Sequence, residues 1–227
     1  MNPENRLQEI KEELQSVLTG RGNWLDAVLP PVIFILVNAF AGVNLAVGGA
    51  LLVSAIFAVY RLARRQPVRY ALGGVGAVLV AAGVAYLTGR AEGYFLPGIV
   101  TGILTVILCL VSVIIKRPLV AFTSYIARRW PLEWYWHLKV RPAYSEVTLA
   151  WGVFFGLRTF LQFELFQNQA VSSLGIFQIL SGWPATILLL IFSYFYGLWR
   201  LSNLKGPSVE EFKLGKEPPW EGQKRGF

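Results

Sequence analysis

The distribution of positive charge between apolar segments constrains the fold of this chain more than any other feature. Nineteen of its 21 Lys and Arg residues lie in the two ends of the chain and in the second and fourth gaps between six apolar stretches. Because cytoplasmic loops retain Lys and Arg, the pattern predicts an all-α polytopic membrane bundle of six transmembrane helices, with the N and C termini in the cytoplasm. Each stretch is long enough, or nearly so, to cross a bilayer. The six are residues 25–42, 44–60, 70–88, 95–115, 147–166 and 184–199.

Composition supports the same class. Hydrophobic residues make up 55% of the chain and charged residues 15%, and the mean hydropathy is +0.50. Such a chain is too apolar for an ordinary soluble domain of this length. The first apolar run follows mostly polar residues and precedes no small-residue cleavage site, so we expect it to be retained. Cytoplasmic loops that face anionic lipid headgroups explain the net charge of +8, so we expect no nucleic-acid partner.

Three regions follow from the charge and apolar patterns. Residues 1–23 contain apolar side chains at helical spacing opposite Glu and Lys, and predict a cytoplasmic amphipathic helix. Residues 24–200 form the transmembrane domain, and residues 201–227 form a polar cytoplasmic tail. The mixed charge of the first helix favours docking on the cytoplasmic face of the protein itself or on a partner protein, and both remain open.

Two positions should interrupt the apolar helices. The segment 27–60 is uncharged, and as one helix its 34 residues would extend about 51 Å, well beyond a hydrocarbon core of about 30 Å. We therefore expect a turn at 41–44, where Gly42 and Asn44 tolerate unusual backbone angles. The second interruption is SGWP at 181–184, which predicts a short outer or re-entrant piece over 171–181 and a last helix that starts near Pro184.

Bulky aromatic residues alternate with cations between the fourth and fifth predicted helices. Trp130, Trp134 and Trp136, with Tyr135 and Tyr144, are predicted to lie at the headgroup level as interfacial anchors. The pattern favours an interfacial segment with helical character rather than a seventh span.

Five short sequences carry a resemblance: LPPVIF at 29–34, RLARRQPVRYALGG at 61–74, TGRAEGYFLPGI at 88–99, KRPLV at 116–120, and the LR pair that includes Arg158. Together they resemble the bacterial membrane family called domain of unknown function 3159, which is distantly similar to the intracellular septation protein A group. The resemblance covers roughly residues 24–200, and Ala121 stands where the family pattern leads us to expect glycine. It implies a multi-pass protein of the bacterial inner membrane, and it carries over no catalytic or binding residue.

The two cations outside the charge pattern, Arg90 and Arg158, define the candidate site. Arg158 lies inside a predicted span, where an unpaired charge costs roughly 2.5–3.5 kcal/mol, so it requires an anion or polar acceptors. One hypothesis is an outward-opening polar pocket. The alternative is a structural ion pair between Arg158 and either Glu92 or Glu164. The pocket would comprise Asn38, Arg90, Glu92, Arg158 and Gln162.

The sequence contains few residues that suggest catalysis, metal binding or proton transfer. The single histidine, His137, lies among tryptophans, which favours headgroup contact over proton relay. The single cysteine, Cys109, is expected to be a small core residue. The sequence contains no cluster with metal-ligand spacing and no nucleophile with a base, so we expect no metal, no cofactor and no enzymatic activity.

Two functional classes remain. The Trp-rich segment and the amphipathic start favour a scaffold or accessory subunit of a cell-envelope or other membrane complex, which contacts partners through those two regions and can be oligomeric. The alternative is a small-solute or ion carrier or channel subunit, which the intramembrane cation and the Pro and Gly interruptions favour. A carrier needs several polar side chains that line a connected interior path, whereas a scaffold needs none.

Overall fold

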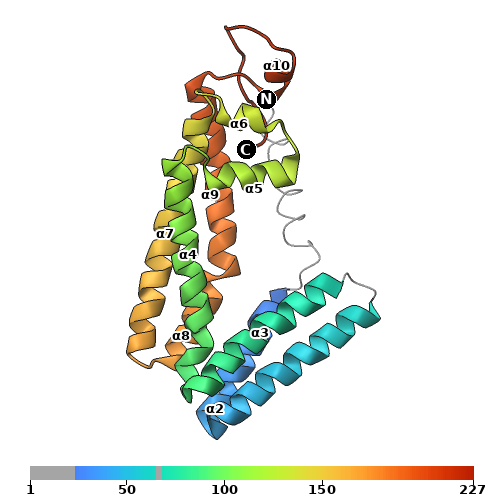
Figure 1. Cartoon of the computed structure of the whole chain (residues 1–227), viewed down its shortest axis with the longest axis vertical. Helices are drawn as coiled ribbons and strands as arrows, with labels where there is room; N and C mark the ends of the chain where they lie inside the picture. The colour runs from blue at the N-terminus through green and yellow to red at the C-terminus, as the bar shows by residue number, and fades with distance from the viewer. Residues whose placement is uncertain (1–23, 65–67) are drawn as a thin grey trace. The chain divides into compact units, whose positions relative to one another are not determined.

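Every regular element is helical in the part of the chain that the computed structural model describes, residues 24–64 and 68–227 (Figure 1). The helices divide between two compact units. Unit 1 holds α2, α3, η1 and the first residues of α8. Unit 2 holds most of α4, the remainder of α8, and all of α5, α6, α7, α9 and α10.

In unit 1, the long apolar segment turns back on itself as predicted. Helix α2 (Trp24–Ala63) is broken at Gly42, whose backbone angles are φ 80° and ψ 174°. A Cβ built on Gly49 would lie 3.3 Å from Ile33 Cγ2 and 3.5 Å from Val37 Cγ2. In a straight helix, Gly49 and Ile33 would be about 24 Å apart along the axis. The two arms of α2 therefore pack against each other, and the positive φ explains why glycine occupies the turn.

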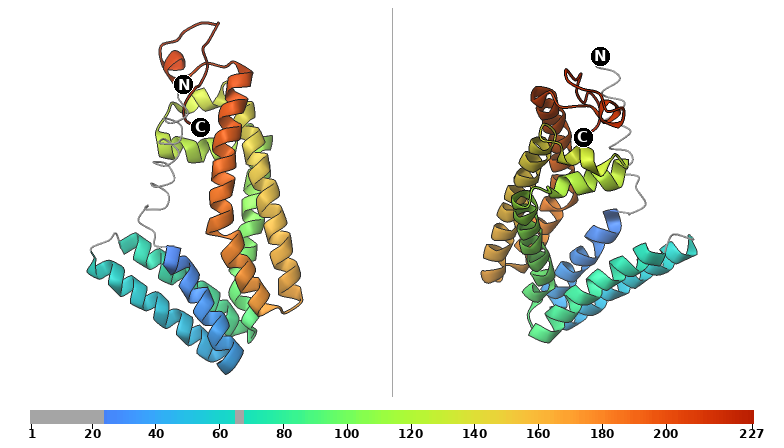
Figure 2. Two further views of the ribbon diagram at one scale, coloured as in Figure 1. Left: turned by 180° about the vertical axis from the view of Figure 1, so that it is seen from behind. Right: turned by 45° about the horizontal axis from the view of Figure 1, so that its top comes forward.

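The rest of unit 1 completes a helical hairpin. Helix α3 (Val68–Thr88) runs beside the second arm of α2 (Figure 2). The short 3-10 helix η1 (Ala91–Phe95) then folds into the unit. Phe34 stacks on Tyr94 with ring centroids 4.1 Å apart, and Phe95 meets both rings edge-on. Residues 92–95, the second half of the polar link that the sequence predicts between the third and fourth helices, are buried in this way.

In unit 2, α4 (Leu96–Ile114), α7 (Arg141–Gln167) and α9 (Trp183–Leu204) run side by side (Figure 1). Glycines bring α4 and α7 close in an antiparallel seam, as small residues do between membrane helices. A Cβ on Gly152 would lie 3.4 Å from Cys109 Cβ, and one on Gly156 would lie 3.9 Å from Val106 Cγ2. A Cβ on Gly102 would collide with Thr159 Oγ1. Cys109 is fully buried in this seam, which confirms its expected role.

The interruption at SGWP is also confirmed. Helix α8 (Val171–Ser181) ends one residue before α9 begins at Trp183. Gly182 lies between them with φ −79° and ψ −119°. A Cβ on Gly182 would approach the Gln178 carbonyl oxygen to 2.8 Å, so the close passage of the chain favours glycine at this point.

The outer surfaces of the helices are apolar. Three stretches of the described chain are long and apolar enough to cross a membrane: Val28–Ala63, which contains the turn at Gly42, Ala91–Ile114 and Val171–Leu204. Large apolar side chains point outward, and Leu157 and Leu188 are 61% and 67% exposed. A soluble protein of this size rarely exposes so much contiguous apolar surface. The chain is therefore an all-helical protein suited to a membrane.

Three shorter helices gather at one end of unit 2. Helices α5 (Leu119–Arg128) and α6 (Leu132–Trp136) lie in the segment for which the sequence predicts helical character without a further span. Helix α10 (Val209–Lys213) lies in the region predicted to be a polar tail. That region is integrated into unit 2, because Leu201, Val209 and Phe227 are all buried in its core. The amphipathic helix predicted within 1–23 lies outside the described residues.

Candidate functional site

Three of the five predicted pocket residues lie in unit 1. Asn38 is half-buried in the first arm of α2. Arg90 caps the start of η1 and is exposed, and its Nε lies 3.9 Å from Glu92 Oε2. The Glu92 residue is buried, with 8% of its surface exposed. An ion pair this long with one exposed partner contributes little stability, so its main effect is to neutralise the buried Glu92 carboxylate.

The other two predicted residues lie in unit 2, on α7. Arg158 is partly buried and its Nε donates a hydrogen bond to Ser181 Oγ at 3.2 Å. Gln162, one turn further along α7, is 2% exposed, and its Nε2 has no hydrogen-bond partner among the described residues. The five residues are thus divided between two compact units. The single pocket built from all of them stays a prediction.

The alternative of a structural ion pair finds no support within unit 2. Glu164, the nearest carboxylate along α7, is exposed, and no ion pair between it and Arg158 is present among the described side chains. Glu92 in unit 1 has Arg90 as its partner. The Arg158 guanidinium is instead next to a hydroxyl at the end of α8.

Two further buried atoms near Arg158 lack partners in the described part of the chain. They are Thr159 Oγ1 and Gln178 Oε1. The pocket predicted from the sequence includes none of Thr159, Gln178 and Ser181. Thr159 and Ser181 are hard to recognise as site residues from the sequence, because Thr and Ser inside an apolar helix usually bond to their own backbone. Thr186 does so, donating to the Gly182 carbonyl oxygen at 2.8 Å.

The opposite end of unit 2 contains a dense aromatic cluster, which we call the aromatic module. Its centre is Trp134, Tyr135 and Tyr144, each with no exposed surface. Their ring centroids lie 5.1–6.1 Å apart in edge-on contacts. Phe227 stacks on Tyr144 at 4.3 Å, although the two residues are far apart in sequence. The module contains Val120, Ala121, Trp134, Tyr135, Val140, Ala143, Tyr144, Val147, Leu201, Val209 and Phe227.

The aromatic module changes the interpretation of the predicted anchors. Trp134 Nε1 donates to the Pro207 carbonyl oxygen at 2.9 Å, and the ring is enclosed by protein. No part of it is left to contact a headgroup, so Trp134 is a core residue. Trp130 and Trp136 keep partly exposed rings, and Arg117 lies 4.4 Å from the centroid of the Trp136 ring. Headgroup contact by these two residues stays a prediction.

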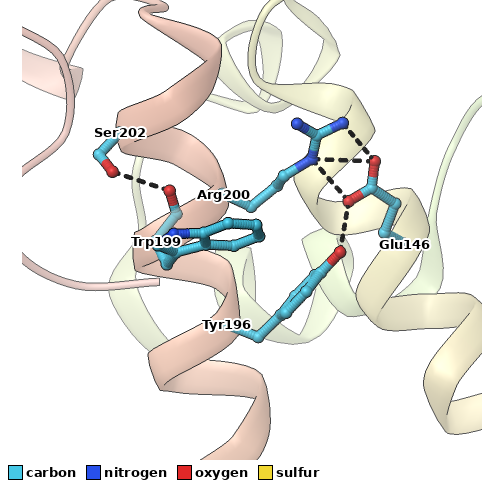
Figure 3. Close-up of polar contacts among 5 residues, drawn as sticks. All are labelled: Glu146, Tyr196, Trp199, Arg200 and Ser202. Carbon is cyan, nitrogen blue, oxygen red and sulfur yellow. Dashed lines mark hydrogen bonds and ion pairs between the residues drawn. The ribbon is translucent and has the colours of Figure 1, made fainter.

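An ion pair joins α7 and α9 beside the aromatic module (Figure 3). Arg200 Nε and Nη2 donate to both oxygens of Glu146, with the shortest distance 2.7 Å, and Tyr196 Oη donates to Glu146 Oε2 at 2.8 Å. The hydrogen bonds from Arg200 lower the pKa of Glu146 below its ordinary value. In the sequence, Arg200 stands out only as one of the cations that predict the topology. For Glu146, the sequence shows only an acidic residue directly before a predicted span, which does not identify its partner.

A second carboxylate fixes the segment after α10. Glu211 accepts from the backbone nitrogens of Ser208, Glu221 and Gly222, at 2.8, 2.8 and 3.3 Å. Ser208 Oγ accepts from the Glu211 nitrogen in return, which completes a capping box. The bond from the Glu221 amide, followed by the bond from Ser208, lowers the pKa of Glu211 to about 2. The carboxylate is therefore charged at neutral pH.

The outer surface of the aromatic module carries an exposed apolar patch. Leu138 and Leu214 are 75% and 71% exposed. Between their segments, the His137 ring lies 5.4 Å from Trp220 and 6.4 Å from Phe212. Burial, and then the charge of Lys139, lower the pKa of His137, so its ring is neutral at pH 7. We call the set His137, Leu138, Lys139, Phe212, Leu214 and Trp220 the outer patch.

Comparison with known proteins places the chain in a family. A family model described as Protein of unknown function (DUF3159) matches residues 18–199, which is well over half of the chain. The match includes both arms of α2, every helix from α3 to α8, and α9 as far as Trp199. Neither the curated proteins nor the solved structures that were searched contained a significant match.

Proposed function

We propose that this chain, which belongs to the family described as Protein of unknown function (DUF3159), is a non-enzymatic multi-pass protein of the bacterial cytoplasmic membrane. In this proposal it serves as a scaffold or accessory subunit of a cell-envelope or other membrane complex. The observation that carries the proposal is the outer patch on the aromatic module. Leucines exposed beside a packed aromatic core and outside the apolar helices are typical of a protein contact.

The proposed topology has six spans, with both ends in the cytoplasm. In support, the two arms of α2 and the helices α3, α4, α7 and α9 match the six predicted stretches. The aromatic module would then face the cytoplasm, and so would the Lys and Arg residues that neighbour it in sequence, such as Arg128, Arg129 and Lys139, consistent with the retention of cations on that side. The C-terminal ends of α4 and α9 lead into this module.

Cysteine labelling tests the topology. In a Cys109→Ala background, Asn168→Cys should react with a membrane-impermeant maleimide in spheroplasts. Lys213→Cys should react only after permeabilisation, because it lies on the opposite side in this topology. Both positions are exposed. The opposite labelling pattern, or equal labelling of both positions in intact spheroplasts, would contradict the six-span arrangement.

Co-purification tests the scaffold. The full-length protein extracted in a mild detergent should retain a stoichiometric partner, and Leu138→Glu with Leu214→Glu should release it. Ser202→Glu is the matched control, since it adds a charge at an exposed α9 position outside the outer patch. A protein that purifies alone from every gentle detergent would contradict the scaffold. If Ser202→Glu also released the partner, the outer patch would not be the contact surface.

A carrier or channel subunit is the second candidate, and Arg158 favours it. Its guanidinium lacks a carboxylate partner within the described residues of unit 2 and lies at a broken helix, a combination found in transporter sites. Arg158→Ala discriminates between the two functions. We expect a carrier to lose its cellular phenotype while still inserting and folding. An unchanged phenotype in a folded variant eliminates the carrier.

A further inference from the structure

Arg158 has most of its hydrogen-bonding capacity unused. A guanidinium carries five N–H donors. Among the described residues, the recorded partner of Arg158 is Ser181 Oγ, and a hydroxyl does not neutralise its charge. A charge inside an apolar helix bundle is costly unless it is paired. The side chain therefore needs an anion that the described part of unit 2 does not supply.

The surroundings of Arg158 contain three buried polar atoms without partners in the described chain: Thr159 Oγ1, Gln162 Nε2 and Gln178 Oε1. Thr159 and Gln162 are 8% and 2% exposed. Each unsatisfied group costs about 1–3 kcal/mol when it is shut away from water. Tyr144 Oη is a further buried atom without a partner in the described chain, but it lies in the aromatic module. The three atoms here differ from it because they accompany a charged side chain that lacks an anion, and that combination points to a ligand.

The helix register brings these atoms together. The seam between α4 and α7 pairs Cys109 with Gly152, Val106 with Gly156 and Gly102 with Thr159. Continued by one turn, the same register places Gln162 opposite Gly98. The Cβ position of Gly98 lies 3.9 Å from Gln178 Oε1. Gln162 Nε2 and Gln178 Oε1 thus come to one level of the bundle, next to a residue without a side chain.

The broken helix adds a positive end at the same place. Ser181, the partner of Arg158, is the last residue of α8, and Gly182 precedes the 22-residue helix α9 as an N-cap without a side-chain hydrogen bond. The first amides of a helix carry a partial positive charge and favour anions. The guanidinium and the start of α9 both favour a negative ligand.

We propose that the break between α8 and α9 is a binding site for a small oxyanion that also carries a hydroxyl group. The oxyanion accepts from Arg158 and from Gln162 Nε2, and the hydroxyl donates to Gln178 Oε1. Monobasic phosphate or a small hydroxycarboxylate has this combination of groups. Arg158 lies nine residues before the end of α7, or about 13 Å. That depth is below the headgroup level and favours a soluble anion over a lipid phosphate.

The site rests on neither the scaffold nor the partner proposed above, because it needs only the helices of unit 2. Its test uses purified full-length protein in lauryl maltoside, with inorganic phosphate as the probe and chloride at matched ionic strength as the reference. Phosphate should raise the Tm saturably. Arg158→Gln should weaken the apparent affinity at least tenfold, and Gln162→Leu should weaken it several-fold.

Arg200→Gln is the matched control, since it removes an arginine that already pairs with Glu146 and should leave the phosphate response unchanged. If Arg158→Gln does not fold, Gln178→Leu replaces it. A soluble ligand is ruled out if phosphate and lactate both fail to raise the Tm beyond chloride. The site itself is overturned if a phosphate or lactate response survives in the site variants.

Native mass spectrometry distinguishes a lipid headgroup from a soluble anion as the ligand of this site. A phospholipid retained by the native protein and lost in Arg158→Gln would support the oxyanion site and assign it to a lipid headgroup. A phosphate-dependent Tm shift in protein free of phospholipid would support a soluble ligand. Absence of both signals overturns the proposal.

Discussion

The two halves of α7 differ in how their polar groups are satisfied. In the first half, Thr148 Oγ1 accepts from the Val120 nitrogen and donates to the Tyr144 carbonyl oxygen, and Trp151 Nε1 donates to Ser193 Oγ. In the second half, Thr159 Oγ1 and Gln162 Nε2 are buried without partners in the described chain. The first half also contains one buried atom without a partner in the described chain, Tyr144 Oη, which lies among aromatic rings. The difference is that the two unpaired atoms of the second half lie on the same helix segment as Arg158, a charge without a carboxylate partner among the described residues of unit 2.

This contrast shows why burial alone does not identify function. Trp134, Tyr135 and Gln162 are all nearly or fully buried. Packing and hydrogen bonds explain the first two, because Trp134 Nε1 bonds to Pro207 and Tyr135 Oη lies 3.1 Å from Ser124 Oγ. They do not explain Gln162. A buried polar group that the protein does not satisfy is the more informative observation.

The largest effect is expected in the aromatic module. Trp134→Ala should lower the free energy of unfolding by about 3–5 kcal/mol, because it empties a fully buried ring site and removes a hydrogen bond. The measurement is denaturant titration in detergent, followed by near-UV circular dichroism. Trp136→Ala, at a half-buried ring, should cost clearly less. Equal costs would show that the module is not a packed core.

A pair of polar-to-apolar changes tests the contrast within α7. Thr148→Val should destabilise the protein by about 1–3 kcal/mol, because it leaves the buried Val120 amide without its acceptor. Without ligand, Gln162→Leu should change stability by less than about 0.5 kcal/mol or raise it, since it removes an unsatisfied amide. The same titration measures both variants. Similar losses would mean that the two halves of α7 do not differ.

The ion pair between α7 and α9 should contribute a smaller amount. A double-mutant cycle with Glu146→Gln and Arg200→Gln should give a coupling of about 0.5–1 kcal/mol, because both side chains remain partly exposed. The exposed pair of Lys224 and Glu221 is the control and should give a coupling near zero. A larger coupling in the control pair would show that the two-oxygen geometry of Glu146 adds nothing.

The smallest effect is local and depends on pH. The pKa of Glu211 is lowered from 4.5 to about 2, so its charged form stabilises the fold. That contribution is fully present above pH 4.5 and is lost as the pH falls toward 2. Hydrogen exchange at the Glu221 and Gly222 amides should therefore lose protection across this range. Glu211→Gln should lack the pH dependence, and Glu210→Gln, at an exposed neighbour, should retain it.

Much of the helix layout follows from the sequence for local physical reasons. An uncharged run too long for one span had to turn, and Gly42 was the residue best suited to a positive φ. Pro184 and Gly182 marked the end of α8 in the same way. In both cases the backbone preference of one or two residues overrides an apolar pattern that would otherwise continue.

The candidate site was only partly accessible from the sequence. Arg158 stood out because a charge in an apolar span is costly wherever it lies. Thr159, Ser181 and the orphaned amide of Gln162 emerged only once the α4–α7 register and the end of α8 were known. Likewise, a tryptophan beside cations has the same sequence signature at a membrane interface as in a core, so Trp134 was assigned to the wrong environment.

The sequence by itself determined the helical class, the positions of the chain breaks and the prominence of Arg158, because length, charge and backbone preference are properties of short segments. The tertiary structure decided which polar groups find partners. Glu146 meets Arg200, Glu211 meets three backbone amides, and Phe227 stacks on Tyr144, all through contacts between separate segments. Around Arg158 the same packing leaves donors and acceptors unsatisfied, since the described residues of unit 2 supply no anion to them.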